Sequence, residues 1–128
     1  MKIAIDLDNT ITASKNSIKF FSILTNLLIA EHRIYIVTNR TPGTEKQIVK
    51  ELKILGIKYD VIIITSNKAD YILKENINVL FENEDEYFLD LSENITVFKI
   101  REDGNFSFAE KKWFYGNKTG INIDNENN

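Results

Sequence analysis

Apolar runs and amphipathic segments alternate along the first hundred residues of the chain. Runs rich in β-branched residues predict five strands, at residues 3–7, 33–38, 59–65, 78–81 and 95–100. Between them, apolar residues at helical spacing predict a helix at 17–31, a second at 45–55 and shorter helices at about 67–75 and 87–91. This alternation predicts an α/β fold with three layers, in which a Rossmann-like parallel sheet of about five strands has helices on both faces.

Small polar residues mark the predicted ends of these helices. Ser17 is the expected N-cap of the first helix, and Thr44 is a candidate N-cap for the second. Gly56 is expected to stop the second helix, and Ser66 or Asn67 is expected to start the third. Residues 10–16 are polar and predict a loop between the first strand and the first helix.

The regular pattern ends after the fifth predicted strand. Asp103-Gly104 predicts a turn, and residues 105–108 are a candidate edge strand. Trp113-Phe114-Tyr115 is a dense aromatic cluster, which we expect to cover the sheet edge or to form a contact in a homo-oligomer, together with the two phenylalanines of the candidate edge strand. We therefore predict a domain over residues 1–116, followed by a polar tail, 117–128, that is partly disordered.

The composition restricts the kinds of site that this chain can form. The 128 residues contain no Cys and a single His, so a metal would be held mainly by oxygen ligands, which favours Mg²⁺ over Zn²⁺. The formal net charge of −3 does not indicate binding to nucleic acid, although it leaves a nucleic-acid partner open. The apolar run at 18–30 is too short and too polar to span a bilayer, and Met1-Lys2 leads directly into a strand. We therefore expect a cytoplasmic protein with no membrane partner.

Two acidic residues end the first predicted strand. In residues 3–10, an apolar run leads into Asp6 and Asp8, which Asn9 and Thr10 follow. If the strand geometry continues this far, the alternation of side chains places both carboxylates on the same side. Neighbouring carboxylates repel each other unless a cation or a shared proton compensates. The pattern suggests a metal-assisted or acid–base site, and the alternative is a solvated turn with two surface acids.

Other predicted strands also end in polar residues. Thr38 ends the second strand, Asn39 and Arg40 follow it, and Lys68 opens the helix after the third strand. An acidic cluster follows the fourth strand and contains Glu82, Asn83, Glu84 and Asp85. Because ligands of open α/β sheets bind at the carboxyl ends of the strands, we expect these groups to meet there. The combination suits phosphoryl transfer. For Arg40, we expect either a contact with phosphate or an ion pair with a surface acid.

These residues resemble the four motifs of the haloacid dehalogenase (HAD) superfamily phosphatases. Asp6-Leu7-Asp8-Asn9-Thr10 resembles the first motif, DxDxT, and Thr38 resembles the Ser or Thr of the second. Lys68 resembles the Lys of the third motif, and Glu82-Asn83 resembles the acidic pair of the fourth. The resemblance covers about residues 2–100. It implies a HAD-like fold and a Mg²⁺-dependent phosphatase that acts on a phosphorylated substrate.

The resemblance implies a role for each matched residue. Asp6 would attack the phosphorus atom and form an aspartyl-phosphate, and Asp8 would serve as general acid and then as general base. Thr38 would hold phosphoryl oxygens, and Lys68 would offset the negative charge on the phosphate and on Asp6. The substrate-binding residues that we predict are Thr38, Asn39, Arg40 and Lys68.

The same resemblance places Mg²⁺ between the first and fourth motifs. The expected ligands are Asp6, the main-chain carbonyl of Asp8 and the amide oxygen of Asn83, while Glu82 would act through a water molecule. Glu84 is a further candidate ligand if the alignment of the fourth motif is shifted by one residue. Many relatives carry two acids in the fourth motif, whereas this chain carries Asn83. This departure motivates an alternative function, in which a catalytically weak or inactive HAD-like domain serves as a binding or regulatory module.

The predicted elements leave no room for a cap domain. HAD relatives with caps insert them after the first motif or between the second and third. Here residues 10–33 hold one predicted loop and one helix, and residues 41–67 hold one predicted helix and one strand. An open site accepts a bulky substrate or is closed by another subunit. The candidate substrates are a nucleotide, a nucleic-acid end, a sugar phosphate and a phosphoprotein. A receiver-type phospho-acceptor domain would need an Asp where the third strand ends in Thr65-Ser66, so we do not expect one.

Overall fold

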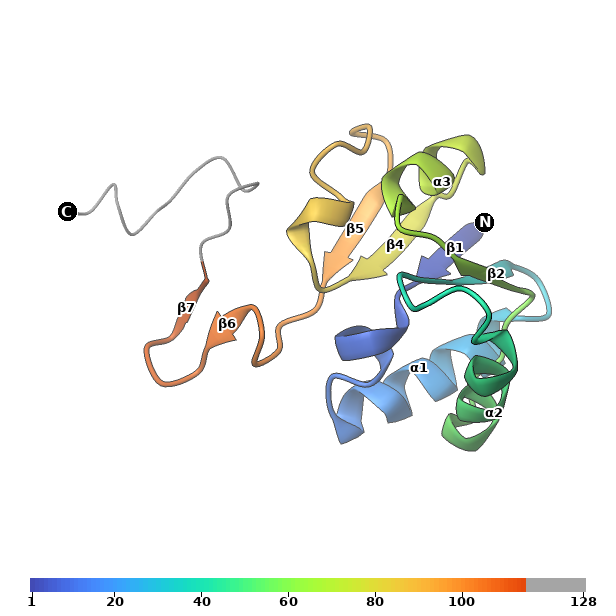
Figure 1. The fold of residues 1–128 in the computed structure, drawn as a ribbon, viewed down its shortest axis with the longest axis horizontal. Helices are drawn as coiled ribbons and strands as arrows, with labels where there is room; N and C mark the ends of the chain where they lie inside the picture. The colour runs from blue at the N-terminus through green and yellow to red at the C-terminus, as the bar shows by residue number, and fades with distance from the viewer. Residues whose placement is uncertain (115–128) are drawn as a thin grey trace.

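Five parallel strands form the central sheet in the computed structural model, which describes residues 1–114 (Figure 1). The strands are β1 (Lys2–Ile5), β2 (Arg33–Thr38), β3 (Val61–Ile64), β4 (Val79–Glu82) and β5 (Thr96–Lys99). Their order is β3-β2-β1-β4-β5, so the chain builds outward from β1 on one side and then continues on the other. The carboxyl end of β1 is therefore the topological switch point, where α/β folds bind ligands. The predicted Rossmann-like α/β fold is confirmed.

Helices cover both faces of this sheet, as predicted (Figure 1). The helices are α1 (Lys15–Leu28), α2 (Glu45–Leu55) and α3 (Lys68–Lys74). Side chains that alternate along the strands form two separate buried clusters. Ile3 and Ile5 of β1 belong to the cluster with Phe21 of α1, whereas Ala4 belongs to the cluster with Ile72 of α3. The first strand is thus buried on both faces, which explains its uninterrupted apolar run.

The first helix begins earlier than predicted. Its N-cap is Ser14, whose side chain accepts a hydrogen bond from the backbone N–H of Ser17 at 3.0 Å. Ser17 therefore lies inside the first turn, and its hydroxyl donates to the carbonyl of Thr10. The loop predicted at 10–16 is also wrong in part, because residues Leu7–Ile11 form a short π-helical turn, η1, directly after β1. The helix ends three residues before the predicted position, since turns lead from it into β2.

The second and third helices match their predictions. Helix α2 ends at Gly56, whose φ of 74° lies in the left-handed region that favours glycine. A Cβ at this position would lie 2.9 Å from Ser22 Oγ, so the glycine also lets α1 and α2 approach each other. Thr44 occupies the N-cap position of α2, but its hydroxyl donates to the Thr41 carbonyl instead. Helix α3 begins after Asn67, whose side chain caps it.

The structure shows no helix at residues 87–91, where one was predicted. Asp85–Tyr87 forms a single 3₁₀ turn, η2, and further turns follow it. The apolar residues Phe88 and Leu91 pack against the cluster under α3. Their spacing of three residues is satisfied by tight turns as well as by an α-helix, so the sequence pattern does not distinguish the two.

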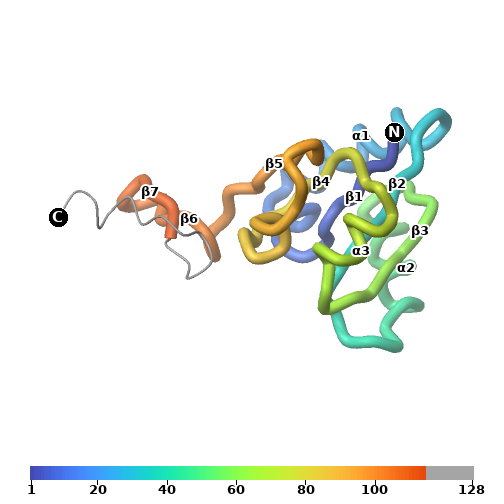
Figure 2. Tube along the Cα trace, turned by 90° about the horizontal axis from the view of Figure 1, so that it is seen from above, coloured from blue at the N-terminus to red at the C-terminus, as the bar shows by residue number. Residues whose placement is uncertain are grey.

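The segment after β5 forms a hairpin outside the central sheet. Strand β6 (Phe106–Ser107) pairs antiparallel with β7 (Lys112–Trp113), and Figure 2 shows this hairpin extending away from the sheet. The prediction of an edge strand at 105–108 is therefore wrong, because β6 pairs with β7, which follows it after one turn. The ring centres of Trp113 and Phe106 are 5.1 Å apart. Lys99 Nζ, at the end of β5, lies 4.2 Å from the centre of the Trp113 ring. These contacts join the hairpin to β5.

Two other expectations concern the extent of the chain. The predicted boundary at residue 116, the tail at 117–128 and Tyr115 of the aromatic cluster lie outside the described residues. Within residues 1–114, no helix has the length and the apolar character that crossing a bilayer requires. Between Lys2 and Lys99, no further domain interrupts the sheet and its helices, in agreement with the prediction of a domain without a cap.

Candidate active site

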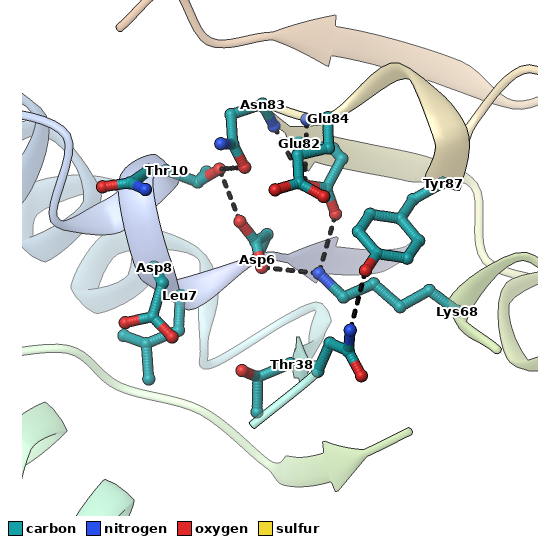
Figure 3. Close-up of polar contacts among 12 residues, drawn as sticks. Asp6, Leu7, Asp8, Thr10, Thr38, Lys68, Glu82, Asn83, Glu84 and Tyr87 are labelled. Atoms are coloured by element: carbon teal, nitrogen blue, oxygen red, sulfur yellow. Dashed lines mark hydrogen bonds and ion pairs between the residues drawn. The ribbon is translucent and has the colours of Figure 1, made fainter. Parts of the chain in front are cut away.

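Asp6 lies at the topological switch point, directly after the middle strand of the sheet. Its backbone N–H donates to the Phe81 carbonyl at 3.0 Å, which extends the pairing of β1 with β4. The residue is 4% exposed, and both of its carboxylate oxygens have donors (Figure 3). Lys68 Nζ lies 2.6 Å from Oδ1, and Thr10 Oγ1 lies 2.8 Å from Oδ2. Side chains from α3 and η1 therefore orient this carboxylate from two sides.

Lys68 joins Asp6 to a second buried carboxylate, that of Glu82. Its Nζ lies 2.9 Å from Glu82 Oε1, and both residues are almost completely buried. The other oxygen of Glu82 accepts hydrogen bonds from the backbone N–H groups of Asn83 and Glu84, at 3.0 and 3.2 Å. The ring of Tyr87 covers the ammonium group, with its centre 4.4 Å from Nζ. One ammonium thus serves two carboxylates, and this buried cluster carries excess negative charge when both are ionised.

The protonation equilibria of the cluster reflect this imbalance. Burial raises the pKa of Asp6, although Lys68 and Thr10 act in the opposite direction. Burial and the nearby charge of Asp6 raise the pKa of Glu82 to about 7. Burial by itself would lower the pKa of Lys68, but the two carboxylates outweigh it and raise that pKa above its ordinary value. Lys68 therefore stays charged, and a further proton or a cation would stabilise the cluster.

Asp8 lies apart from this cluster (Figure 3). Because β1 ends at Ile5, the alternation of side chains does not continue to Asp8, and its carboxylate pairs with Arg40 instead. Arg40 Nε lies 2.9 Å from Asp8 Oδ2, and Nη2 lies 2.8 Å from Oδ1. Arg40 also forms an ion pair with Glu51 of α2. Of the two expectations for Arg40, the structure shows the ion pair with acids. The hydrogen bonds from Arg40 lower the pKa of Asp8 below its usual range.

Thr38 and Asn39 line the opposite side of the site, at the end of β2. Thr38 is buried, and its Oγ1 accepts a hydrogen bond from the backbone N–H of Arg40 at 3.3 Å. The side-chain amide of Asn39 donates to the hydroxyl of Tyr87 at 2.8 Å. Tyr87, which lies on η2, therefore links the end of β2 to the start of α3. Tyr87 was not among the predicted site residues, because an aromatic residue after an acidic run has no distinctive signal of its own.

Asn83 directs its side chain into the site beside Thr10 (Figure 3). Its Oδ1 lies 3.2 Å from Thr10 Oγ1, and its Nδ2 donates to Glu102 Oε1 at 3.3 Å. The Thr10 hydroxyl has one proton, which Asp6 Oδ2 and Asn83 Oδ1 share as acceptors. Asn83 is 4% exposed, so its position is well defined by packing. Glu102 lies outside every motif in the sequence, and no local pattern indicated it.

The predicted residues meet around one polar pocket of about 170 Å³. At about 30 Å³ per water molecule, this volume corresponds to roughly five or six waters, enough for a phosphoryl group. The pocket is lined by Asp6, Asp8, Asn9, Thr38, Asn39, Arg40, Lys68, Glu82, Asn83, Glu84 and Tyr87. Asp85, the last member of the predicted acidic cluster, is not among these residues and pairs with Lys99 at 2.6 Å.

The donors around Asp6 fit a hard divalent cation such as Mg²⁺. Among residues 1–114, no three His, Cys, Asp or Glu side chains are grouped so that they could hold a metal by themselves. However, Asp6 Oδ2 and the amide oxygen of Asn83 share a single proton donor, so one of these oxygens retains its lone pairs for a cation. Mg²⁺ commonly binds one or two protein oxygens and keeps several waters. The excess negative charge that the cluster carries when Asp6 and Glu82 are both ionised favours such an ion.

Comparisons with known proteins support the fold. No family model matches the sequence, and no curated protein matches it. Among solved structures, the chain is similar to a chain in the "Structure of Pnkp1/Rnl/Hen1 complex", with a TM-score of 0.61 and 12% sequence identity. The match covers 79% of this chain and 46% of that chain, so the protein spans less than half the length of the structure that it resembles. This similarity shows a shared α/β fold.

Proposed function

We propose that this chain is a Mg²⁺-dependent phosphatase of the HAD type, which hydrolyses phosphomonoesters through an aspartyl-phosphate on Asp6. The observation that carries the proposal is the buried carboxylate of Asp6, held by Lys68 and Thr10 at the edge of an open polar pocket. A buried ion pair contributes little to stability compared with apolar packing. The arrangement is better explained by a reaction that needs an oriented carboxylate.

In the first step, a carboxylate oxygen of Asp6 attacks the phosphorus atom, and the bond from phosphorus to the leaving-group oxygen breaks. Lys68 offsets the repulsion between the carboxylate and the phosphate, and Thr38 donates a hydrogen bond to a phosphoryl oxygen. The leaving oxygen takes a proton from Asp8. In the second step, water gives a proton to Asp8 and attacks the phosphorus of the aspartyl-phosphate, which releases inorganic phosphate and restores Asp6.

Asp8 has to leave Arg40 before it can act as an acid. The two hydrogen bonds from Arg40 hold Asp8 in its ionised form, with a lowered pKa. A substrate phosphate offers the guanidinium group the same bidentate partner that Asp8 offers. We therefore propose that Arg40 exchanges Asp8 for the substrate phosphate. The carboxyl of Asp8, released from its cation, then regains an ordinary affinity for a proton.

The residues that would hold Mg²⁺ are Asp6 and Asn83, with the main-chain carbonyl of Asp8 as the further ligand that the HAD resemblance implies. When bound, Mg²⁺ would supply charge neutralisation for the carboxylate and for the phosphoryl oxygens. Both oxygens of Glu82 are engaged by Lys68 and by backbone N–H groups, so Glu82 acts by keeping Lys68 in position. Glu84 also lines the pocket and adds to its negative charge when ionised.

The pocket accommodates the phosphoryl group and leaves the remainder of the substrate outside. No cap covers the site within the described residues, and the pocket lining is almost entirely polar. The proposed substrates are therefore phosphomonoesters whose phosphate projects from a larger molecule, namely a nucleotide, a nucleic-acid end, a sugar phosphate or a phosphoprotein.

The test compares the wild type with Asp6→Asn on p-nitrophenyl phosphate and on one ester of each class, with and without Mg²⁺. We expect phosphate release that requires Mg²⁺ and that Asp6→Asn lowers on the order of 10⁴-fold or more, as loss of a nucleophile does. Asp90→Asn is the control, because it makes the same charge change at an exposed residue. Absence of Mg²⁺-dependent release from all of these esters would refute the proposal.

One observation favours the second candidate, a HAD-like binding or regulatory module without turnover. The bidentate contact between Arg40 and Asp8 keeps the expected general acid ionised. If Arg40 does not exchange partners, phosphate esters bind but are not hydrolysed. Esters that raise the melting temperature of the protein in the presence of Mg²⁺, with no phosphate released, would favour this candidate.

A further inference from the structure

Glu102 contacts the site from a segment that has no catalytic motif. It follows β5, and its Oε1 accepts a hydrogen bond from Nδ2 of Asn83 at 3.3 Å. Its other oxygen, Oε2, accepts one from the backbone N–H of Gly104 at 2.7 Å. Both carboxylate oxygens thus have partners, and the side chain is held in one orientation.

Asn105 holds the same segment against the end of β4. Its side-chain amide donates to the main-chain carbonyls of Asn83 and Ile100, both at 2.8 Å. Its side-chain oxygen accepts from the backbone N–H of Glu102 at 2.8 Å. Three hydrogen bonds of one asparagine therefore tie Glu102 to the residue that its carboxylate contacts.

The contact with Glu102 decides which end of the Asn83 amide faces Asp6. An ionised carboxylate only accepts hydrogen bonds, so it selects the NH₂ end of the amide. The oxygen of Asn83 must then point the other way, toward Thr10 and Asp6. The Thr10 hydroxyl could not make this choice alone, because it is able to donate to an oxygen or to accept from an NH₂ group.

Glu102 also brings a negative charge next to a residue that has none. In the fourth motif this chain carries an amide at Asn83, and the carboxylate of Glu102 lies within hydrogen-bond distance of that amide. A carboxylate that accepts from the NH₂ group polarises the amide and makes its oxygen a better ligand for a cation.

We infer that Glu102 is a positioning residue for the Mg²⁺ site, which directs the carbonyl oxygen of Asn83 toward the metal and supplies the charge that Asn83 lacks. This inference rests on the proposed function. Gly104 is part of the arrangement, because a Cβ at that position would lie 2.9 and 3.0 Å from the two carboxylate oxygens of Glu102. The glycine leaves the space that this carboxylate occupies.

The experiment measures Mg²⁺ affinity by calorimetry on the full chain, with Mg²⁺ as the only ligand. We expect Glu102→Gln to weaken Mg²⁺ binding about 10- to 100-fold, as loss of a group that orients a metal ligand does. The control is Asp103→Asn, an exposed neighbour with the same charge change, which should stay within about twofold of the wild type. Gly104→Ala keeps the charge but displaces the carboxylate, and it should weaken binding in the same direction.

A second measurement separates positioning from damage to the fold. In Mg²⁺-free protein, the NMR signals of the Asn83 side-chain NH₂ group should shift in Glu102→Gln and stay unchanged in Asp103→Asn, while the Mg²⁺-free melting temperature of both variants stays close to that of the wild type. In activity assays, Glu102→Gln should require more Mg²⁺ for half-maximal rate and reach nearly the wild-type kcat at saturating Mg²⁺.

The outcomes distinguish this inference from the proposed function. Wild-type protein that binds Mg²⁺ and is active, together with Glu102→Gln of equal Mg²⁺ affinity, would overturn the inference alone. Wild-type protein that binds no Mg²⁺ would overturn the proposed function and the inference with it. If Glu102→Gln loses Mg²⁺ binding and its Mg²⁺-free melting temperature also falls well below that of the wild type, Glu102 has a purely structural role. That result would also overturn the inference.

Discussion

Replacement of Lys68 by methionine tests the buried charge cluster directly. In the structure, Nζ of Lys68 lies 2.6 Å from Asp6 Oδ1 and 2.9 Å from Glu82 Oε1. None of these three residues is more than 4% exposed, so water has little access to replace the lost contacts. Lys68→Met keeps a long, unbranched side chain but removes the charge. Two carboxylates would then remain buried without a cation.

The expected loss follows from the burial of the partners. Removing one member of a buried ion pair typically costs about 3–5 kcal/mol of stability. Because one ammonium serves both Asp6 and Glu82, we expect the upper part of this range, about 4–5 kcal/mol, at pH 8. The uncompensated carboxyls can be protonated at lower pH, and the loss is then smaller.

The sign of the pH dependence follows from the pKa shifts. Burial already raises the pKa of Asp6 and of Glu82 in the wild type, and Lys68 opposes both shifts. Without Lys68 both folded-state pKa values rise further. A raised folded-state pKa contributes stability below the unfolded pKa, and this contribution is lost as the pH rises through the folded-state value. We therefore expect Lys68→Met to cost at least about 1.4 kcal/mol more at pH 8 than at pH 5, the equivalent of one pKa unit.

The assay is urea unfolding followed by circular dichroism at pH 5 and 8, in EDTA to exclude metal ions. Lys74→Met is the matched control on the same helix, because its side chain is 77% exposed and pairs with Asp70 across the surface. Such an exposed pair is worth at most about 1 kcal/mol. Equal losses for the two variants at pH 8 would refute the buried cluster, and a loss for Lys68→Met that did not change with pH would refute the raised pKa values.

Two further predictions concern single carboxyl groups. Burial and Asp6 raise the pKa of Glu82 from 4.5 to about 7, so the metal-free wild type should lose up to about 3 kcal/mol of stability as the pH rises through this interval. Glu82→Gln should flatten that part of the urea-unfolding profile, and an unchanged profile would contradict the assignment. Arg40→Gln should return the pKa of Asp8 upward toward its ordinary value, since hydrogen bonds from Arg40 lower it. Carbon-13 NMR titration of the Asp8 carboxyl measures this shift, Arg33→Gln is the control, and an unmoved pKa would count against the ion pair.

Much of the fold could be predicted because its signals are local. The strands are short runs of β-branched residues, and the predicted bounds differ from the observed ones by at most two residues. Gly56 and Asn67 mark helix ends through the backbone geometry of the residues next to them. Ser14 and Ser17 both look like caps in the sequence, and only the hydrogen bond between them shows which one begins the helix.

The hairpin and the contacts of the site were not predictable in the same way. Asp8 meets Arg40 across 32 residues of sequence, and Asn83 meets Glu102 across 19. No periodicity in the chain encodes either contact, because both depend on how loops at the end of the sheet fold over one another. The pairing of β6 with β7, in place of an edge strand, likewise depends on a turn that the sequence suggested only in part.

The sequence by itself determined that Asp6, Thr38, Lys68 and the Glu82-Asn83 pair would lie together, because parallel strands all end at the same edge of a sheet. It did not determine the electrostatic state of these groups. Only the tertiary structure decided that Lys68 is shared between two buried carboxylates, that Asp8 is held by Arg40, and that the Asn83 amide donates a hydrogen bond to Glu102. The reason is physical: charge and protonation depend on burial and on distances of a few ångströms, which arise only when separate segments pack against each other.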